Sequence, residues 1–359
     1  MEKSTRGNIF SAFLIIAFLI PIHLEAVQNT QLVKNELSID FNDVGFYKSI
    51  SGLYCYKDML FIIDFKGGKV LKFNYKNQLS FEKIIGNKGL GPGDIQKPIS
   101  ISIDRDIIAI KDQGSVSFFN IDGSYISKFR IFSSYMSMWL LNKRLYNLVS
   151  NPKSSHLFEV FCLDGNRIMT FGEEYLEIAY EIKKGLPFPL LKRELYDGDI
   201  FLDQNYIYYI NKNFGILRKY NHSGDLILEK SLIDLFGKNA SNKVRHNKKE
   251  FLEKEYVLSK QNPKIGIKNI YLKARFVNDK FYFLLDQHNS LENRPIFQIK
   301  ILCIEKNNLK LQSVYNYDLQ DKEWLSCFAV KMMDEIPIFI LDIKTQEGIE
   351  LYEFRPAFK

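Results

Sequence analysis

One pattern of three short strands recurs along the chain, and it constrains the fold more than any other feature of the sequence. In the first copy an apolar strand at 60–64 ends in Asp, and polar turns then separate it from a second strand and a third. Repetition at this scale is typical of solenoids, propellers and arrays. The copies span residues 60–85, 107–132, 144–171, 206–232, 280–317 and 336–354.

A further short apolar stretch precedes each copy, so that each repeat would contain four strands. Alternating apolar residues, with Asn, Asp or Gly at the turns, predict antiparallel hairpins. Four antiparallel strands per repeat make up the blade of a propeller. The sequence therefore predicts an all-β, six-bladed β-propeller of four-stranded antiparallel blades. The preceding stretches are 52–56, 99–103, 136–141, 199–203, 271–277 and 324–330.

The last repeat lacks an outer strand, because the chain ends shortly after residue 354. The segment 32–41 alternates in the manner of a strand and has no other place in the pattern. We expect this N-terminal strand to complete the last blade and to close the ring. Closure of this kind removes an open sheet edge that would otherwise favour aggregation.

Two stretches are longer than a connection between blades requires, and we expect insertions near 173–197 and 233–269. In the second, Phe251, Leu252, Tyr256 and Leu258 have near-helical spacing, which predicts some helix. Long loops in compact domains are commonly lids or binding loops. Apart from these insertions, residues 27–359 are expected to form one propeller domain.

The chain begins with a segment typical of export. Lys3 and Arg6 precede an almost unbroken apolar run at 9–22, and residues 24–26 offer a cleavage site. This layout predicts a signal peptide over residues 1–26. An uncleaved membrane anchor is the alternative, since the residues before the site are not the usual small ones. We expect the protein to be exported to the periplasm, the cell envelope or the medium.

The charge and the cysteines exclude several classes of function. The formal net charge is +7, with acidic and basic residues interleaved, so no nucleic-acid-binding stripe is present. Cys55, Cys162, Cys303 and Cys327 show no zinc-site spacing. Cys55 and Cys327 fall in the innermost strands of the first and last blades, where a disulfide is conceivable in an exported protein. The alternative is four buried thiols that act as small apolar fillers.

Part of the first two repeats resembles the NHL-repeat pattern. An apolar strand that ends in Asp64 is followed by the basic and apolar strand 69–73, and the glycine-rich segment 86–94 leads to Pro98. The whole chain is similar to exported six-bladed propeller proteins common in Bacteroidetes. The resemblance implies a fold but little about function, because propellers serve as enzymes, receptors and scaffolds.

The repeated strand-end aspartates and the glycine-rich segment have structural explanations. We expect the aspartates to accept hydrogen bonds from turn amides rather than to form an acidic site. The segment 86–93 lacks the Lys-Ser/Thr ending of a phosphate-binding P-loop, so we interpret it as a connection between blades. The aspartates are Asp64, Asp112, Asp286 and Asp342.

Candidate site residues come from the inner strands. Trp139, Arg275 and Trp324 are the aromatic and guanidinium groups that commonly anchor ligands, and we predict them as ligand-binding residues, with packing between blades as the alternative. Asp199 and Asp203 have the spacing of one strand face, which suits either an acid/base pair or a channel lining. No catalytic residue is predicted. The histidines His156, His222, His246 and His288 form no metal-binding cluster in the sequence.

Two functions remain open at this point. The first is an exported, non-catalytic binding or scaffold protein that recognises a peptide, a glycan or a protein at the cell envelope. The second, by analogy with NHL-like propellers, is a calcium-dependent hydrolase or lyase of the lactonase kind. Calcium ligands need no sequence motif, so a channel calcium ion stays open too. Contact with a membrane is expected only through an uncleaved N-terminal anchor, and no nucleic-acid partner is expected.

Overall fold

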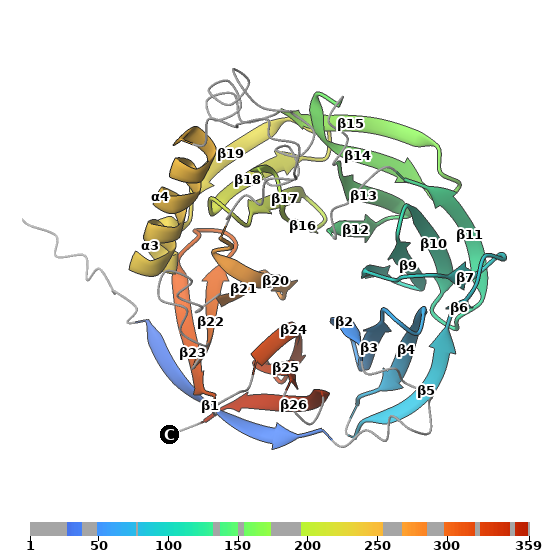
Figure 1. Ribbon diagram of the computed structural model, residues 1–359, viewed down its shortest axis with the longest axis horizontal. Coiled ribbons are helices and arrows are strands. Elements are labelled where there is room, and N and C mark those ends of the chain that lie inside the picture. The colour runs from blue at the N-terminus through green and yellow to red at the C-terminus, as the bar shows by residue number, and fades with distance from the viewer. Residues whose placement is uncertain are drawn as a thin grey trace, which may run out of the picture.

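The strands of the protein form a ring around a central axis in the computed structural model (Figure 1). The N-terminal segment 1–26, with the predicted signal peptide or anchor, lies outside the described residues. None of the helices in the described part of the chain is long and apolar enough to cross a membrane. The structure describes residues 27–37, 49–76, 78–131, 137–149, 154–173, 195–253, 268–285, 298–319, 324–344 and 349–357.

Four separate four-stranded antiparallel sheets occupy more than half of the ring. The strand bounds lie close to those predicted from the repeat, because alternating apolar residues and turn residues define both ends of each strand. Strands β6 (Asn87–Lys88) and β7 (Asp94–Ile95) form a small ladder in the glycine-rich connection. The four sheets are β2 (Ile50–Tyr56), β3 (Met59–Asp64), β4 (Lys69–Asn74) and β5 (Ser80–Ile85); β8 (Ser100–Asp104), β9 (Ile107–Asp112), β10 (Ser115–Asn120) and β11 (Tyr125–Arg130); β12 (Met138–Leu141), β13 (Arg144–Leu148), β14 (His156–Cys162) and β15 (Arg167–Glu173); and β16 (Gly198–Leu202), β17 (Tyr206–Asn211), β18 (Ile216–Asn221) and β19 (Leu226–Ser231).

The remaining strands form one continuous eight-stranded sheet instead of two separate four-stranded blades. Its order is β20-β21-β22-β23-β1-β26-β25-β24. The fold is thus an all-β propeller, but the structure shows four separate sheets and one double-length sheet where the sequence predicts six separate blades. The strands are β1 (Gln28–Glu36), β20 (Tyr271–Val277), β21 (Lys280–Leu285), β22 (Gln298–Glu305), β23 (Leu311–Asp318), β24 (Trp324–Met333), β25 (Ile336–Lys344) and β26 (Ile349–Pro356).

Strand β1 joins the two halves of this sheet. Its residues 32–36 pair antiparallel with β26, as expected for a strand that completes the last repeat. Its residues 28–31 pair in parallel with β23, which the sequence analysis did not foresee. One N-terminal strand therefore covers the edges of two neighbouring strand groups, and the blade boundary at this place is lost.

Tight hairpin turns connect each inner strand to the second strand of its group. Positive φ angles at Asn142 (50°) and Lys143 (60°), and at Asn278 (48°) and Asp279 (59°), are those of the two-residue turns that match the twist of antiparallel strands. Asn and Asp tolerate this left-handed region better than most residues. We call the ends of the inner strands that lead into these turns the turn ends.

The core lies between neighbouring sheets. On β3, Leu60 and Ile62 pack with the residues of β24 and β25, whereas Phe61 and Ile63 pack with β9. Successive side chains of a strand point to opposite faces, so each sheet contributes alternate residues to the cores on its two sides. All four side chains are fully buried, and burial of such groups contributes roughly 1.5–3 kcal/mol each.

The strand-end aspartates bond backbone amides, as their repetition predicts. Asp64 Oδ1 accepts a hydrogen bond from the Gly67 amide at 2.9 Å. Asp112 accepts from the amides of Gln96 and Lys97 in the preceding connection, at 2.8 and 2.6 Å. Asp286 lies outside the described residues. The aspartates therefore fix turns and connections, which accounts for their recurrence.

Two helices occupy part of the second expected insertion. They are α3 (Ile233–Phe236) and α4 (Lys238–Glu253), and they lie at the rim of the ring (Figure 1). Phe236 and Ala240 pack in the same core cluster as Tyr271 of β20. Residues 174–194 and 254–267, which hold most of both expected insertions, lie outside the described residues.

The cysteines are free thiols. Cys303 and Cys327 are buried, and Cys55 and Cys162 are half-buried. The disulfide between Cys55 and Cys327 that the sequence analysis considered is not formed. Cys55 and Cys327 instead belong to the apolar cluster between the first sheet and β24–β25, where small thiols act as fillers.

Candidate functional site

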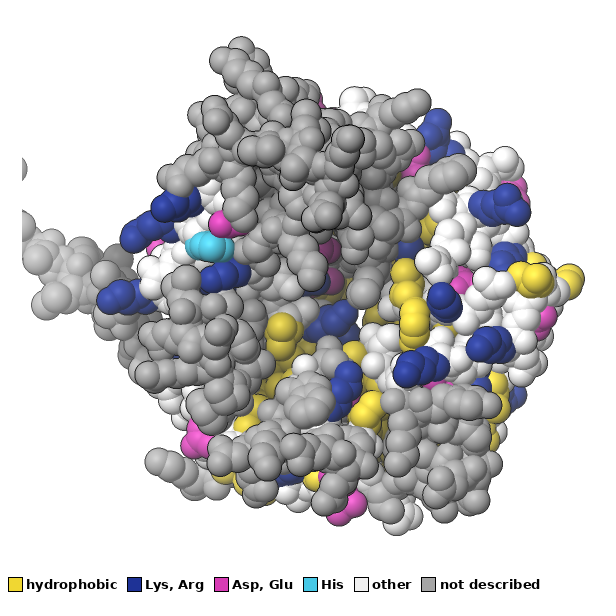
Figure 2. Space-filling view, in the orientation of Figure 1, with side chains coloured by type: hydrophobic (Ala, Val, Ile, Leu, Met, Phe, Trp, Pro, Cys, Tyr) yellow, Lys and Arg dark blue, Asp and Glu magenta, His cyan; other side chains and the backbone are white. Residues whose placement is uncertain are grey.

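A cavity of about 340 Å³ lies at the centre of the ring, and we call it the channel pocket. All six inner strands, β2, β8, β12, β16, β20 and β24, contribute to its wall. Figure 2 shows basic and hydrophobic side chains together at the centre of the ring. The aromatic and charged residues of its lining include Tyr54, Trp139, Asp199, Phe201, Arg275 and Phe276.

The lining follows the repeat. Five inner strands place one residue each at an equivalent position, where it pairs with the third residue of the second strand. The sixth equivalent residue, Lys331, is absent from the pocket wall and donates to the carbonyl oxygen of Tyr75. The five residues that line the pocket are Tyr54, Ser102, Trp139, Phe201 and Arg275.

Three aromatic side chains form one side of the pocket, and we call them the aromatic wall. The rings of Trp139 and Phe201 meet edge to face with centroids 5.6 Å apart. The rings of Phe201 and Phe276 have centroids 6.2 Å apart. Contacts of this geometry hold large flat surfaces in place and leave apolar area for a ligand.

Arg275 crosses from β20 toward the first sheet. Its Nη1 donates to the Ala274 carbonyl at 2.8 Å, and its Nη2 donates to the Leu53 carbonyl on β2 at 2.9 Å. The guanidinium lies over the rings of Tyr54 and Phe328, at 4.7 and 5.4 Å from their centroids. Its Nε is buried and has no hydrogen-bond partner among the described residues.

The charge of Arg275 has no carboxylate partner in the described part of the chain. The ion pairs of that part involve other lysines and arginines. A guanidinium held by neutral carbonyls and ring faces keeps most of its attraction for an anion. Arg275 is therefore a cation of the pocket wall that no described carboxylate pairs with.

Asp199 is the one carboxylate among the residues that line the described wall, and its Oδ2 is buried without a hydrogen-bond partner there. Burial of the nearby Lys212 ammonium acts to lower its pKa, but the charges of Asp199 and Asp197 outweigh this and raise that pKa. Burial, followed by the same two charges, raises the pKa of Tyr271 well above its usual value. Asp199 therefore interacts with a cation outside the pocket wall.

Serine hydroxyl groups connect the inner strands. Ser102 Oγ on β8 accepts a hydrogen bond from the Leu140 amide on β12 at 2.8 Å. Ser137 Oγ accepts from the Ile200 amide on β16 at 2.7 Å. These bonds satisfy inner-strand amides that would otherwise face the channel, and they fix the spacing of the strands. The pocket is therefore largely preformed, as small-molecule sites usually are.

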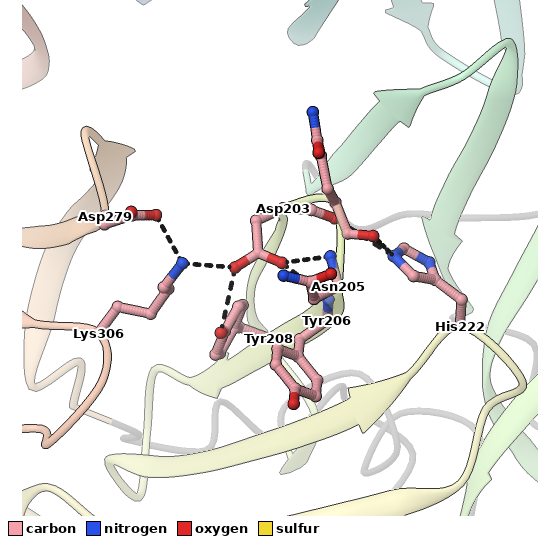
Figure 3. Close-up of polar contacts among 8 residues, drawn as sticks. Asp203, Asn205, Tyr206, Tyr208, His222, Asp279 and Lys306 are labelled. Carbon is pink, nitrogen blue, oxygen red and sulfur yellow. Dashed lines mark hydrogen bonds and ion pairs between the residues drawn. The ribbon is translucent and has the colours of Figure 1, made fainter.

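A polar network lies beside the turn ends of β16 and β20 (Figure 3). Lys306 Nζ lies 2.8 Å from Asp203 Oδ2 and 2.5 Å from Asp279 Oδ1. Asp203 also accepts hydrogen bonds from the Tyr206 amide at 2.8 Å and the Tyr208 hydroxyl at 3.2 Å. Lys306 Nζ lies 5.9 Å from the ring centroid of Phe276, so the network supports the aromatic wall from behind.

The network shifts the pKa values of its members. Burial acts to raise the pKa of Asp203, but the bonds from Lys306 and from two turn amides outweigh it and lower that pKa. Burial acts to lower the pKa of Lys306, but its two carboxylate partners raise it. Burial and the adjacent Asp203 raise the pKa of Tyr208. The lowered pKa of Asp203 and the raised pKa of Lys306 both favour the charged pair drawn in Figure 3.

Two of the three predicted ligand-binding residues, Trp139 and Arg275, line the pocket. Trp324 begins β24 and pairs through its backbone with Lys344, and its side chain lies outside the described residues. Asp199 lines the pocket, whereas Asp203 belongs to the polar network, so the two do not act as a pair. Tyr54, Phe201 and Phe276 were not predicted as site residues, although alignment of the repeats places Tyr54 and Phe201 at the position of Trp139.

The described residues contain no group of three or more His, Cys, Asp or Glu side chains that could hold a metal ion. Calcium prefers several carboxylate and carbonyl oxygens, whereas the described pocket wall has Asp199 together with Lys57, Lys273 and Arg275. This donor set does not fit a calcium ion. Of the histidines, His222 bonds the Asp203 and Gln204 carbonyls at 3.2 and 3.1 Å outside the pocket, and His288 lies outside the described residues.

Comparison with known proteins identifies the fold. No family model matches the chain, and no curated protein matches it. A Bacteroides fragilis protein whose name describes it as exported matches 93% of this chain over 100% of its own, with a TM-score of 0.55 and 14% identity. A DUF4221-family member from Bacteroides vulgatus matches 91% over 97%, with a TM-score of 0.51 and 11% identity.

A weaker likeness extends to an enzyme. An inactive variant of virginiamycin B lyase from Staphylococcus aureus, solved with quinupristin, matches 90% of this chain over 88% of its own. The TM-score is 0.46 and the identity is 12%, so this likeness carries no functional argument. The two bacterial structures with TM-scores above 0.5 support the β-propeller fold and leave function to be argued from the site.

Proposed function

We propose that the protein is an exported, non-catalytic binding propeller that holds its ligand in the channel pocket. The main support is one preformed cavity that joins an aromatic wall to Arg275, which has no carboxylate partner among the described residues. Apolar walls with a few fixed polar groups are the usual make-up of ligand sites. The partner would be a peptide, a glycan or a protein at the cell envelope.

The proposal also includes a count of six blades and a likeness to NHL repeats. We count β20–β23 as a fifth blade and β24–β26 with β1 as a sixth, because each group repeats the four-strand order of the separate sheets. The NHL likeness is supported by Asp64, which closes its turn, and by the positive φ of Gly86 (70°) and Gly93 (80°) in the glycine-rich connection. Such angles favour glycine.

Export rests on residues 1–26. Mass spectrometry of the protein produced in a bacterial host with an intact envelope should give a mature chain that begins near residue 27 and fractionates outside the cytoplasm. A chain that keeps residue 1 and sediments with membranes would support the anchor instead. A chain that keeps residue 1 and stays in the cytoplasm would overturn export.

Binding is tested by screening immobilised peptide and glycan arrays with labelled protein. We expect ligands whose signal falls at least about tenfold for Trp139→Ala and Phe276→Ala, because each substitution removes a half-buried aromatic side chain from the pocket wall. Arg167→Met is the matched control, since Arg167 is exposed and pairs with Glu159 on the outside of the third sheet. Array signals that are the same for the wild type and both pocket variants would contradict the proposal.

A further inference from the structure

One edge of the Arg275 guanidinium, formed by Nε and Nη2, has an incomplete set of hydrogen-bond partners among the described residues. The Nε and Nη2 hydrogens of a guanidinium point the same way and together match the two oxygens of a carboxylate. In this edge Nη2 has the neutral Leu53 carbonyl as its acceptor, and Nε has none among the described residues. The opposite nitrogen, Nη1, is held separately by the Ala274 carbonyl.

This arrangement leaves two donors of one edge with one neutral acceptor. Buried donors are nearly always satisfied in folded proteins, and a buried exception calls for an explanation. A carboxylate at this edge would replace one neutral bond by two charge-assisted bonds. The Nη1 bond and the ring of Tyr54 would keep the guanidinium in place during the exchange.

The surroundings favour an anion with an apolar body. Lys57 and Lys273 line the same pocket as Arg275, and Asp199 is the one carboxylate in the part of the wall that the structure describes. The aromatic wall offers an apolar surface of inclined rings in the same cavity. A volume of about 340 Å³ is near the lower end of ordinary ligand sites, so the group that enters is small.

Resting on the proposed binding function, we propose that the ligand inserts a carboxylate onto the Nε/Nη2 edge of Arg275 and packs an aromatic or apolar group on the aromatic wall. This is the chemistry of a free aromatic acid and of a peptide with an apolar carboxyl-terminal residue. A peptide satisfies it with its chain end in the pocket and the rest of the chain outside.

The alternative is that the ligand binds not at Arg275 but at Asp199. Its unpartnered Oδ2 would suit an ammonium group, and a ligand anchored there would be a cation. Lys212 and its partner Asp197 lie near Asp199, and the charges of both carboxylates raise the pKa of Lys212. Arg275 forms no ion pair with a described carboxylate, so the anion assignment is favoured.

Calorimetry with matched probes tests the proposal on the full protein. The probes are 3-phenylpropionate, its neutral amide 3-phenylpropanamide and the cation 3-phenylpropylamine. We expect the acid to bind at least about tenfold more tightly than the amide, since only the acid forms charge-assisted bonds. Equal binding of acid and amide, tighter binding of the amine, or no binding of the acid would overturn the carboxylate assignment.

A second pair of probes separates the two sources of the carboxylate. Acetyl-Gly-Gly-Phe with a free carboxyl terminus should bind more tightly than the same peptide as an amide. If only the small acid shows this preference, the ligand is a free acid; if the peptide shows it too, a chain end is accepted. In both cases the preference should vanish in Arg275→Met and persist in Arg167→Met.

An NMR measurement on the wild-type protein tests the proposal even if Arg275→Met does not fold. In protein labelled with ¹⁵N-arginine, 3-phenylpropionate should move the Nε–H resonance of Arg275, and the amide should not. An unmoved resonance would overturn the assignment. Failure of the proposed binding function would give a different result. Array signals that do not change in Trp139→Ala and Phe276→Ala would show that ligands do not bind in the channel pocket, whatever charge they carry.

Discussion

The Nη2 of Arg275 on β20 lies 2.9 Å from the carbonyl oxygen of Leu53 on β2. Strand β24 lies between these two strands, since it contacts both. One side chain therefore connects strand groups that are not neighbours in the ring. A group that bridges the channel through a single neutral bond is well placed to exchange that bond for a ligand.

The buried Lys111 should make stability depend on pH. Its ammonium is fully buried and donates to Asn147 Oδ1 at 3.0 Å, and burial lowers the pKa of Lys111 to about 7. Between that value and 10.5 the unfolded chain binds more protons than the native one, so the free energy of unfolding rises with pH there, by at most about 1.4 kcal/mol per pH unit.

Urea melts of the wild type and Lys111→Met between pH 6 and pH 10 measure this contribution. The difference between the two proteins cancels the titration of other groups. We expect the wild type to gain stability relative to the variant from pH 7 upward, with little relative change below pH 7. A difference that stays constant over the whole range would show that Lys111 keeps its proton in the fold.

Much of the architecture follows from local patterns. Alternating side chains and positive-φ turns fix the inner strands, and the predicted stretch 271–277 coincides with β20. The pairing of β1 with β23 could not be predicted in this way, because it relies on backbone hydrogen bonds that no side-chain pattern encodes. A strand at a sheet edge is compatible with either neighbour.

The site was predictable in part, for a similar reason. Trp139 and Arg275 stand out by residue type, and the repeat places them at equivalent positions. The contact between Lys306 and Asp203 joins residues that are 103 positions apart, and neither residue type is unusual. Such a pair depends on how adjacent sheets meet, which the strand pattern does not specify.

The ion pair of Asp203 with Lys306 should contribute stability above mildly acidic pH. Because the native pKa of Asp203 is lowered below the usual 3.8, its contribution is present above pH 4 and is lost as the pH falls through the native value. Asp203→Asn should cost about 1–2 kcal/mol at pH 7, reduced for partial exposure, and less at pH 3.

Denaturant melts at both pH values check this, with Asp106→Asn as the control. Asp106 is an exposed residue of the corresponding turn in the second sheet. The control should change stability by less than about 0.5 kcal/mol at either pH. Equal losses for Asp203→Asn at pH 7 and pH 3 would indicate that its turn geometry, and not its charge, matters.

Cys55 should be unreactive in the native protein. Burial raises the pKa of its thiol to about 12, although the charges of Lys331 and Arg275 act in the opposite direction. Because the thiolate is the reactive form, native alkylation by iodoacetamide at pH 8 should be slower by roughly a thousandfold than in denaturant. Peptide mass spectrometry after timed alkylation measures this, and rapid labelling of Cys55 would contradict it.

Calcium should leave the stability of the protein unchanged. The described pocket wall combines Asp199 with three cationic side chains, which is a poor donor set for a doubly charged ion. A ligand that binds only the native state raises the melting temperature as its concentration increases. Thermal melts with millimolar calcium and with a chelator should therefore coincide, and a dose-dependent rise would restore the calcium-dependent enzyme hypothesis.

Removal of residues 28–36 should open the ring at one place. Strand β1 pairs with β23 through its first half and with β26 through its second half, so its deletion exposes two strand edges at once. It also removes the side chain of Leu32, which is 3% exposed, and this alone costs roughly 1.5–3 kcal/mol. We expect a lower melting temperature and self-association through the exposed edges on size-exclusion chromatography.

A synthetic peptide of residues 27–37, added in trans, should reverse both effects, because an added strand can pair with an open sheet edge. The same peptide with Leu32→Asp is the matched control. It can form the same backbone bonds but would bury a charge in the cluster around Phe339 and Phe354. If the truncated protein stays monomeric with an unchanged melting temperature, β1 does not contribute to stability or to closure of the ring. Equal rescue by both peptides would mean that backbone pairing alone closes the ring.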